Sequence, residues 1–156
     1  NEQQITEMDL GRFNVPLLLI APGMQDKFGV RDHTVGTQID IVPTIMGRLG
    51  GEVRHQCWGR DLLNLPEGDT GFGVIKPSGS EQTTAIITQD QVLVLPKEKD
   101  MAPKMYKYQL GANPGAEVVP DAPRTAEMKQ KLEAFLQTAT KSLMDNTAGV
   151  VDGTPD

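Results

Sequence analysis

The strongest constraint on the fold is a continuous apolar run near the start of the chain, VPLLLIA, from Val15 to Ala21. Pro22 and Gly23 end this run, and a short apolar run bounded by turn residues is typical of a β-strand buried on both faces. Pro16 fits near the start of such a strand, where a missing N–H group is tolerated. The run is too short to span a bilayer, and no signal-like segment accompanies it. We therefore expect a buried strand here and no membrane span in this chain.

From about residue 72 to 110 the sequence changes to short strand-like segments separated by turn residues. FGVIK, TTAIIT, QVLVL and MYKYQL are rich in the apolar, β-branched and aromatic residues that favour strands. Only Gln89 and Asp90 separate TTAIIT from QVLVL, which predicts a β-hairpin. GANPGAE and PDAP are typical of turns. We expect a small antiparallel sheet in this region.

Two segments have the apolar spacing of helices. DIVPTIMGRLGG, at residues 40–51, begins with Asp40 at a suitable N-cap position and ends with Gly50 and Gly51, so we expect a short helix with one buried face. A long helix is predicted from Pro123 to Met144, with one apolar stripe packed on the core. That stripe comprises Met128, Leu132, Phe135, Leu136, Ala139 and Leu143.

Composition excludes several classes of site. The 156 residues carry a net charge of −6, which disfavours nucleic acid as a partner. One cysteine, Cys57, and two histidines are too few for an internal disulfide or the common zinc sites. We interpret Cys57 as a half-buried small residue rather than a thiol site with His55. We expect no cofactor in this chain.

Three ordered motifs resemble a known family. NVPLLLIAPGM, HTVGTQIDIVPTIMGRLGG and WGRDLL are similar to the C-terminal part of the sulfatase family, within the alkaline phosphatase superfamily. The run HTVGTQID at residues 33–40 is most similar to the lipoteichoic acid synthase and phosphoglycerol transferase group. YKYQLGANPGAE resembles a strand and turn near the end of sulfatases. The resemblance covers roughly residues 13–117.

The resemblance implies an α/β fold, with this chain as the C-terminal portion of an alkaline-phosphatase-like domain. That portion would contain one buried strand plus a packing helix, a small antiparallel sheet and a long C-terminal helix. Residues 1–120 would belong to the sulfatase-like domain, 121–146 to a terminal helix that packs on it, and 147–156 to a frayed tail. Family members use a Thr, Ser or formylglycine nucleophile at a divalent metal. The motifs for these groups precede the strand that residues 15–21 match.

This order bears on Asp32 and His33, whose side-by-side position resembles a metal-binding pair. The family's metal pair precedes the matched strand and is usually followed by Gly, whereas Asp32 and His33 follow it and precede Thr34. The resemblance therefore implies an ordinary loop, with Arg31 and His33 at the periphery of the substrate groove as the alternative. Asp40 is expected to cap a helix. We predict no catalytic and no metal-binding residues in this chain.

The resemblance implies a fragment of a phosphoglycerol transferase or hydrolase that acts on phospholipid-derived or related phosphate esters. The parent protein would be membrane-anchored, would lie at the periplasmic or extracellular face of the cytoplasmic membrane, and would use a divalent metal such as Mn²⁺. The alternatives are a fragment of a true sulfatase, or of a non-catalytic periplasmic lipid-binding or sensing module with a degenerate sulfatase fold. The expected partner is the missing N-terminal catalytic half, with self-association through residues 15–21 when that half is absent.

Overall fold

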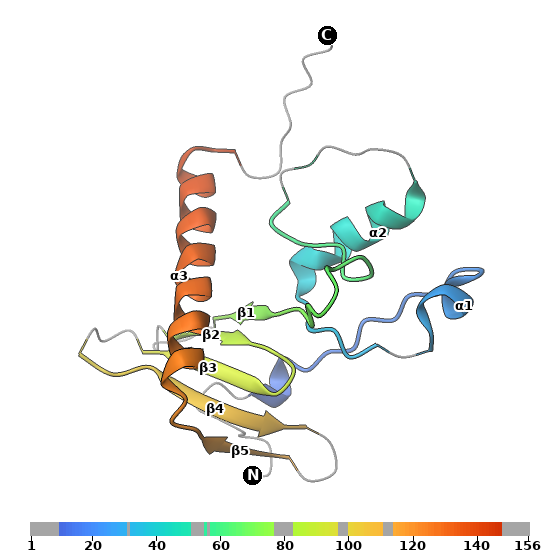
Figure 1. The fold of residues 1–156 in the computed structure, drawn as a ribbon. Coiled ribbons are helices and arrows are strands. Elements are labelled where there is room, and N and C mark those ends of the chain that lie inside the picture. Colours follow the sequence, from blue (N-terminus) through green and yellow to red (C-terminus); the bar gives the residue numbers. More distant parts are fainter. Residues whose placement is uncertain are drawn as a thin grey trace.

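The computed structural model describes residues 10–30, 32–50, 55, 57–76, 83–96, 100–110 and 114–147. An antiparallel sheet with one long helix across it forms the centre of this region (Figure 1). Its five strands are β1 (Gly73–Ile75), β2 (Thr84–Ile87), β3 (Gln91–Leu95), β4 (Lys104–Gln109) and β5 (Gly115–Val118). Their spatial order is the chain order, so each strand pairs with its neighbours in sequence. The mixed α/β class and the antiparallel sheet are confirmed.

The predicted hairpin is the β2–β3 pair. Ile87 lies opposite Val92, and the Thr88 N–H donates to the Gln91 carbonyl at 2.8 Å, which closes the turn at Gln89 and Asp90. The other edges of these two strands pair with β1 and β4.

Strand β5 corrects the sequence interpretation, which assigned GANPGAE to a turn. Gly115 pairs with Gln109, and Val118 pairs with Tyr106, so the second half of that motif belongs to the sheet. Most β5 side chains are exposed. The strand therefore depends on backbone pairing with β4 and carries little of the apolar pattern that marks a strand in a sequence.

The described helices are α1 (Met24–Phe28), α2 (Ile41–Leu49) and α3 (Ala122–Met144), together with the 3₁₀ turns η1 (Leu10–Arg12) and η2 (Gln38–Asp40). Both predicted helices are present. Gly50 follows α2 with a φ of 78°, a conformation that glycine adopts without strain. The Asp121 carboxylate accepts a hydrogen bond from the Arg124 N–H at 3.0 Å and so caps α3. No described helix combines the length and apolar character needed to cross a membrane.

The sheet carries a separate apolar cluster on each face, because successive side chains of a strand point to opposite sides. On one face, Met128 and Leu132 of α3 pack in a cluster with Ile86, Leu93 and Met105. The other face is covered by Leu10 of η1, which is 2% exposed. Its neighbours there are Ile75, Ala85, Val92, Val94 and Tyr106.

The predicted buried strand at residues 15–21 is wrong. This segment runs as irregular chain between η1 and α1 (Figure 1) and belongs to no strand. Val15, Leu18 and Ile20 are 78%, 78% and 86% exposed. Burial on both faces requires neighbours on both sides, and the described part of the chain supplies none.

The packing prediction for α2 also needs correction. The buried residues of α2 are Pro43 and Thr44. Of the five apolar residues with helical spacing, Ile41 and Met46 are half-buried, whereas Val42, Ile45 and Leu49 stay exposed. The described part of the chain therefore covers the apolar face of α2 only in part.

Helix α3 provides a matched test of the core. We expect Leu132→Ala to reduce the free energy of unfolding by about 2–5 kcal/mol, because Leu132 is fully buried and its truncation leaves a cavity. Leu143 was predicted to belong to the packed stripe, but it is 65% exposed beyond the edge of the cluster. Leu143→Ala therefore serves as the control and should change stability by less than about 0.5 kcal/mol. Urea unfolding followed by circular dichroism measures both. Equal effects would contradict the packing of α3 on the sheet.

Candidate functional site

The second and third resemblance motifs meet at a buried carboxylate, that of Asp40, which is 1% exposed. Arg60 reaches it from the loop that follows α2. The Arg60 backbone N–H donates to Asp40 Oδ1 at 2.7 Å, and its guanidinium donates from Nε to Oδ1 at 3.2 Å and from Nη2 to Oδ2 at 3.1 Å. Charge-assisted bonds of this kind are stronger than neutral ones. They join the QID and WGR motifs directly.

Thr37 completes the surroundings of this carboxylate. Its backbone N–H and its hydroxyl donate to Asp40 Oδ2 at 2.8 and 3.3 Å. Asp40 does occupy the N-cap position of α2, but its side chain makes no capping bond to that helix. It turns back to η2 and across to Arg60 instead. The Asp40 side chain therefore caps η2, the turn that leads into α2, through a capping box with Thr37, and it also forms a tertiary ion pair with Arg60.

Thr44 adds a second link between the same two motifs. Its hydroxyl donates to the Asp40 carbonyl at 2.7 Å and accepts a hydrogen bond from the Leu62 N–H at 3.0 Å. A buried hydroxyl needs such partners, since leaving it unpaired is unfavourable. We refer to Thr37, Asp40, Thr44, Arg60 and Leu62 as the clamp.

Arg60 also connects the clamp to the sheet. Its Nη2 donates to the Phe72 carbonyl at 2.7 Å, directly before β1, and its guanidinium lies 4.0 Å from the centre of the Phe72 ring. Lys131 of α3 lies 4.2 Å from the same ring, and Phe135 meets it edge to face at 6.3 Å. A cation over an aromatic face is attracted to it. Phe72 therefore joins the clamp to α3.

The chemistry of the clamp is structural. The Asp40 carboxylate accepts from Thr37 and Arg60, and the Thr44 hydroxyl is occupied by backbone partners. These groups are directed at one another rather than into a substrate cavity. The arrangement can position the chain, and it does not offer a nucleophile or an open metal ligand.

Asp32 and His33 lie in a loop beside the β2–β3 hairpin. Asp32 Oδ1 accepts hydrogen bonds from the Thr34 hydroxyl at 2.6 Å and from the Thr34 N–H at 2.7 Å. The side-chain bond, and then the backbone bond, hold the pKa of Asp32 below its ordinary value because both stabilise the charged form. Gln89 Nε2 donates to the His33 carbonyl at 3.0 Å and ties the loop to the hairpin. Arg31 lies outside the described residues.

His55 and Cys57 do not form a thiol–imidazole pair in this conformation. The His55 Nδ1 atom accepts a hydrogen bond from the Cys57 backbone N–H at 3.2 Å, so their contact is a local turn. Among the residues that the structure describes, no three His, Cys, Asp or Glu side chains group closely enough to hold a metal ion.

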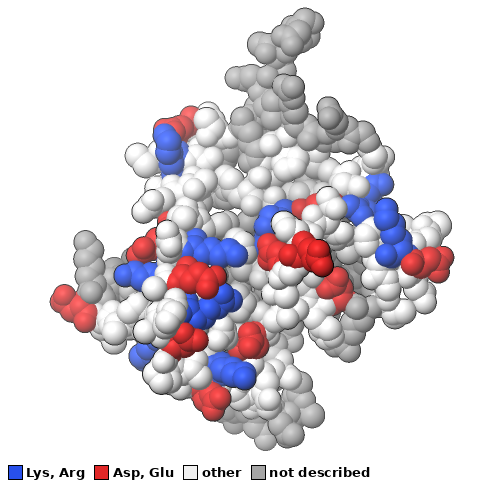
Figure 2. All heavy atoms as spheres, viewed as in Figure 1, with Lys and Arg blue, Asp and Glu red and all other residues white. Residues whose placement is uncertain are grey.

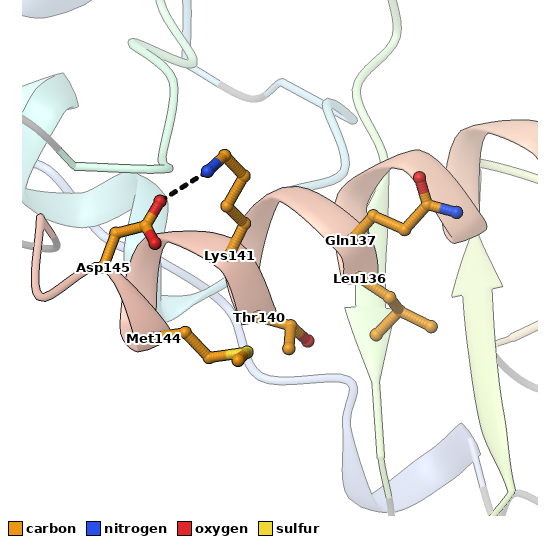
Figure 3. Close-up of a pocket in the computed structure, with 6 residues that line it drawn as sticks. All are labelled: Leu136, Gln137, Thr140, Lys141, Met144 and Asp145. Atoms are coloured by element: carbon orange, nitrogen blue, oxygen red, sulfur yellow. Dashed lines mark hydrogen bonds and ion pairs between the residues drawn. The ribbon is translucent and has the colours of Figure 1, made fainter.

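A shallow hollow of about 580 Å³ lies along the C-terminal part of α3 (Figure 3). Lys141 Nζ binds Asp145 Oδ2 at 2.6 Å at its edge, while Met144 is 80% exposed. Figure 2 shows acidic and basic side chains interspersed on the visible face rather than gathered by sign. Neither feature indicates a particular ligand.

Comparison of the chain with protein-family models, with curated proteins and with solved structures finds no match. The resemblance to sulfatases therefore depends on the motifs themselves. What the structure adds is their arrangement in space, with the second and third motifs in direct contact.

The ion pair can be tested by removing one partner. We expect Arg60→Met to lower the free energy of unfolding by about 3 kcal/mol, because it leaves the Asp40 carboxylate buried without a counter-charge. Glu133→Gln in the exposed Lys129–Glu133 pair is the control and should cost at most about 1 kcal/mol. Urea unfolding at pH 7 measures both. A cost for Arg60→Met no larger than the control would show that the clamp does not hold the fold.

The hydrogen bonds from Thr34 to Asp32 make the stability contributed by Asp32 depend on pH. Because the folded-state pKa of Asp32 is lowered, its contribution to stability is present above the unfolded pKa and is lost as pH falls through the folded pKa. Thr34→Val removes the hydroxyl donor and should raise the Asp32 pKa. A ¹³C NMR titration of the carboxyl carbons measures the shift, with Thr138→Val on the exposed side of α3 as control. An unchanged Asp32 pKa in Thr34→Val would refute the assigned cause.

Proposed function

We propose that this chain is the C-terminal portion of a sulfatase-like phosphoglycerol transferase or hydrolase, and that it supports a catalytic centre located in the other portion of the domain. The observation that carries the proposal is the contact between motifs. Asp40 and Thr44 of QIDIVPT bind Arg60 and Leu62 of WGRDLL. This contact supports the proposal because it places the second and third motifs side by side in the fold.

Among the residues that the structure describes, no three His, Cys, Asp or Glu side chains group as metal ligands. The proposal assigns the nucleophile and the divalent ion, Mn²⁺ or a similar metal, to the N-terminal portion. Asp32 accepts hydrogen bonds from Thr34, and Asp40 is enclosed by Thr37 and Arg60. A metal ligand needs lone pairs that face an open position. In the proposal, the role of this chain is to hold its loops and sheet in place beside the catalytic centre.

The exposed apolar side chains support the proposal that another part of the protein covers this chain. Val42, Ile45 and Leu49 form one exposed stripe on α2, and the segment at residues 15–21 adds a second apolar surface. Apolar surface of this kind marks an interaction site in a soluble domain. In the proposal, the N-terminal catalytic half packs on these surfaces in a parent protein outside the cytoplasm, where its phospholipid-derived ester substrates lie.

The first test of the proposal is enzymatic. The 156-residue chain should not hydrolyse a chromogenic phosphodiester or a chromogenic sulfate ester in the presence of Mn²⁺. A longer protein that adds the upstream part of the same reading frame should turn over the phosphodiester, and a chelator should abolish this activity. Initial rates at several Mn²⁺ concentrations measure both.

Three outcomes would contradict the proposal. Metal-dependent turnover by the 156-residue chain that disappears in Asp32→Ala or His33→Ala would place a catalytic centre in this chain. Turnover of the sulfate ester alone by the longer protein would favour a true sulfatase. An upstream sequence without a nucleophile and acidic ligands would favour the non-catalytic binding or sensing module.

A further inference from the structure

We propose that residues 13–30 form a hinged strap, which is closed when the ring of Phe28 stacks on the guanidinium of Arg48 and open when that contact breaks. This inference does not rest on the proposed function, because it concerns the motion of one segment of this chain. The strap contains α1, which lies at the periphery of the molecule (Figure 1). None of residues 13–30 is buried.

Both ends of the strap are attached to the rest of the chain. Before it, Leu10 is 2% exposed in the apolar cluster on one face of the sheet. After it, the Val35 N–H donates to the Thr70 carbonyl at 2.9 Å, and Val35 forms a parallel bridge with Gly71. The strap can therefore move between two fixed points while the sheet stays folded.

The interior of the strap is held mainly by bonds to itself. The Met24 N–H donates to the Ala21 carbonyl at 3.2 Å, and the Gly29 N–H donates to the Gln25 carbonyl at 2.9 Å. Among the described residues, the ring contact that joins the strap to another element is that of Phe28, whose ring centre lies 4.9 Å from the guanidinium of Arg48 in α2. A segment with few buried contacts opens at a low free energy.

Arg48 is positioned by a contact that does not involve the strap. Its Nη2 atom binds Asp61 Oδ2 at 2.6 Å. A Cβ atom at Gly47 would overlap the Asp61 carboxylate, so this ion pair packs directly on α2. Stacking of Phe28 on Arg48 is a cation–π contact, which changes an equilibrium by about two- to five-fold at an exposed site. We therefore expect both the closed and the open position to be populated.

Two glycines provide the hinges. Gly23 precedes α1 with a φ of 75°, and Gly29 follows it with a φ of 81° and a ψ of −177°. A Cβ atom at either position would meet no other atom within 4 Å, so glycine is favoured there by backbone conformation and not by packing. The conformation of Gly29 is essentially restricted to glycine. Rotation at such positions, at the two ends of a short helix, lets α1 turn as one unit.

Distances between pairs of spin labels measure the position of the strap. In a Cys57→Ser background, labels at Gln25→Cys on α1 and Thr138→Cys on α3 compare the strap with the helix that packs on the sheet. Double electron–electron resonance should give two distance populations for this pair. Glu67→Cys with Thr138→Cys is the reference pair, because both positions lie outside the strap, and it should give one narrow distance.

The stacking contact is tested by changing the ring. Phe28→Ala should raise the ratio of open to closed strap by about two- to five-fold, and Phe28→Trp should lower it, since tryptophan binds cations best. Phe13→Ala is the matched control, because it makes the same change at the other end of the strap and should leave the ratio unchanged. Circular dichroism confirms that these variants fold, since neither residue belongs to the apolar clusters on the sheet.

The hinge is tested by adding one methyl group. Gly29→Ala should reduce the closed population, because alanine rarely adopts the backbone conformation that the closed strap requires. Gly68→Ala is the matched control. Gly68 has the same φ of 81° and equally open surroundings, but it lies outside the strap.

Four results would overturn the inference. One narrow distance between Gln25→Cys and Thr138→Cys would show that the strap is rigid, and one broad distribution in every variant would show that it has no closed position. A ratio that Phe28→Ala leaves unchanged, or that Phe13→Ala raises equally, would mean that stacking on Arg48 does not close the strap. A closed population that survives Gly29→Ala would place the hinge elsewhere.

Discussion

The ion pair between Asp40 and Arg60 determines how the first half of the chain is placed relative to the sheet. A carboxylate that is 1% exposed is strongly unfavourable unless its charge is compensated and its oxygen atoms accept hydrogen bonds. Arg60 supplies the charge, and Thr37 supplies further donors. Because Arg60 also binds the carbonyl of Phe72, directly before β1, the same side chain connects the start of α2 to the start of the sheet.

Two glycines make this close approach feasible. A Cβ atom at Gly59 would overlap the carbonyl of Ile39, so the residue before Arg60 must lack a side chain. Gly71 has a φ of 76° and lies against the carbonyl of Val35, with which it forms a parallel bridge. The left-handed conformation there favours glycine. Backbone contact at these two places, together with the ion pair, joins residues 35–40 to residues 59–71.

Local patterns predicted local structure well. The end of α2 at Gly50, the long helix α3 and the β2–β3 hairpin each follow from residues within one segment. Strand β5 was missed because its sequence carries little apolar alternation, and its place is set by pairing with β4. The ion pair was missed for a related reason. Asp40 stands at a position that suits a helix cap, and nothing in its neighbourhood indicates that Arg60, 20 residues later, reaches its carboxylate.

The predicted buried strand at residues 15–21 is absent for a different reason. Its apolar pattern is present, but the described part of the chain provides no apolar surface to bury it. Of the described hydrophobic residues, those that are fully buried are Leu10 and residues from Ile75 onward, so the region between them has no apolar centre of its own. The clamp that organises this region is polar. A buried ion pair specifies geometry better than it contributes net stability, because desolvation offsets most of its attraction. The segment at residues 15–21 and the exposed side chains of α2 therefore provide most of the apolar surface in this half of the molecule that is still open to water. Covering these side chains would remove apolar area from water and so stabilise this half of the molecule.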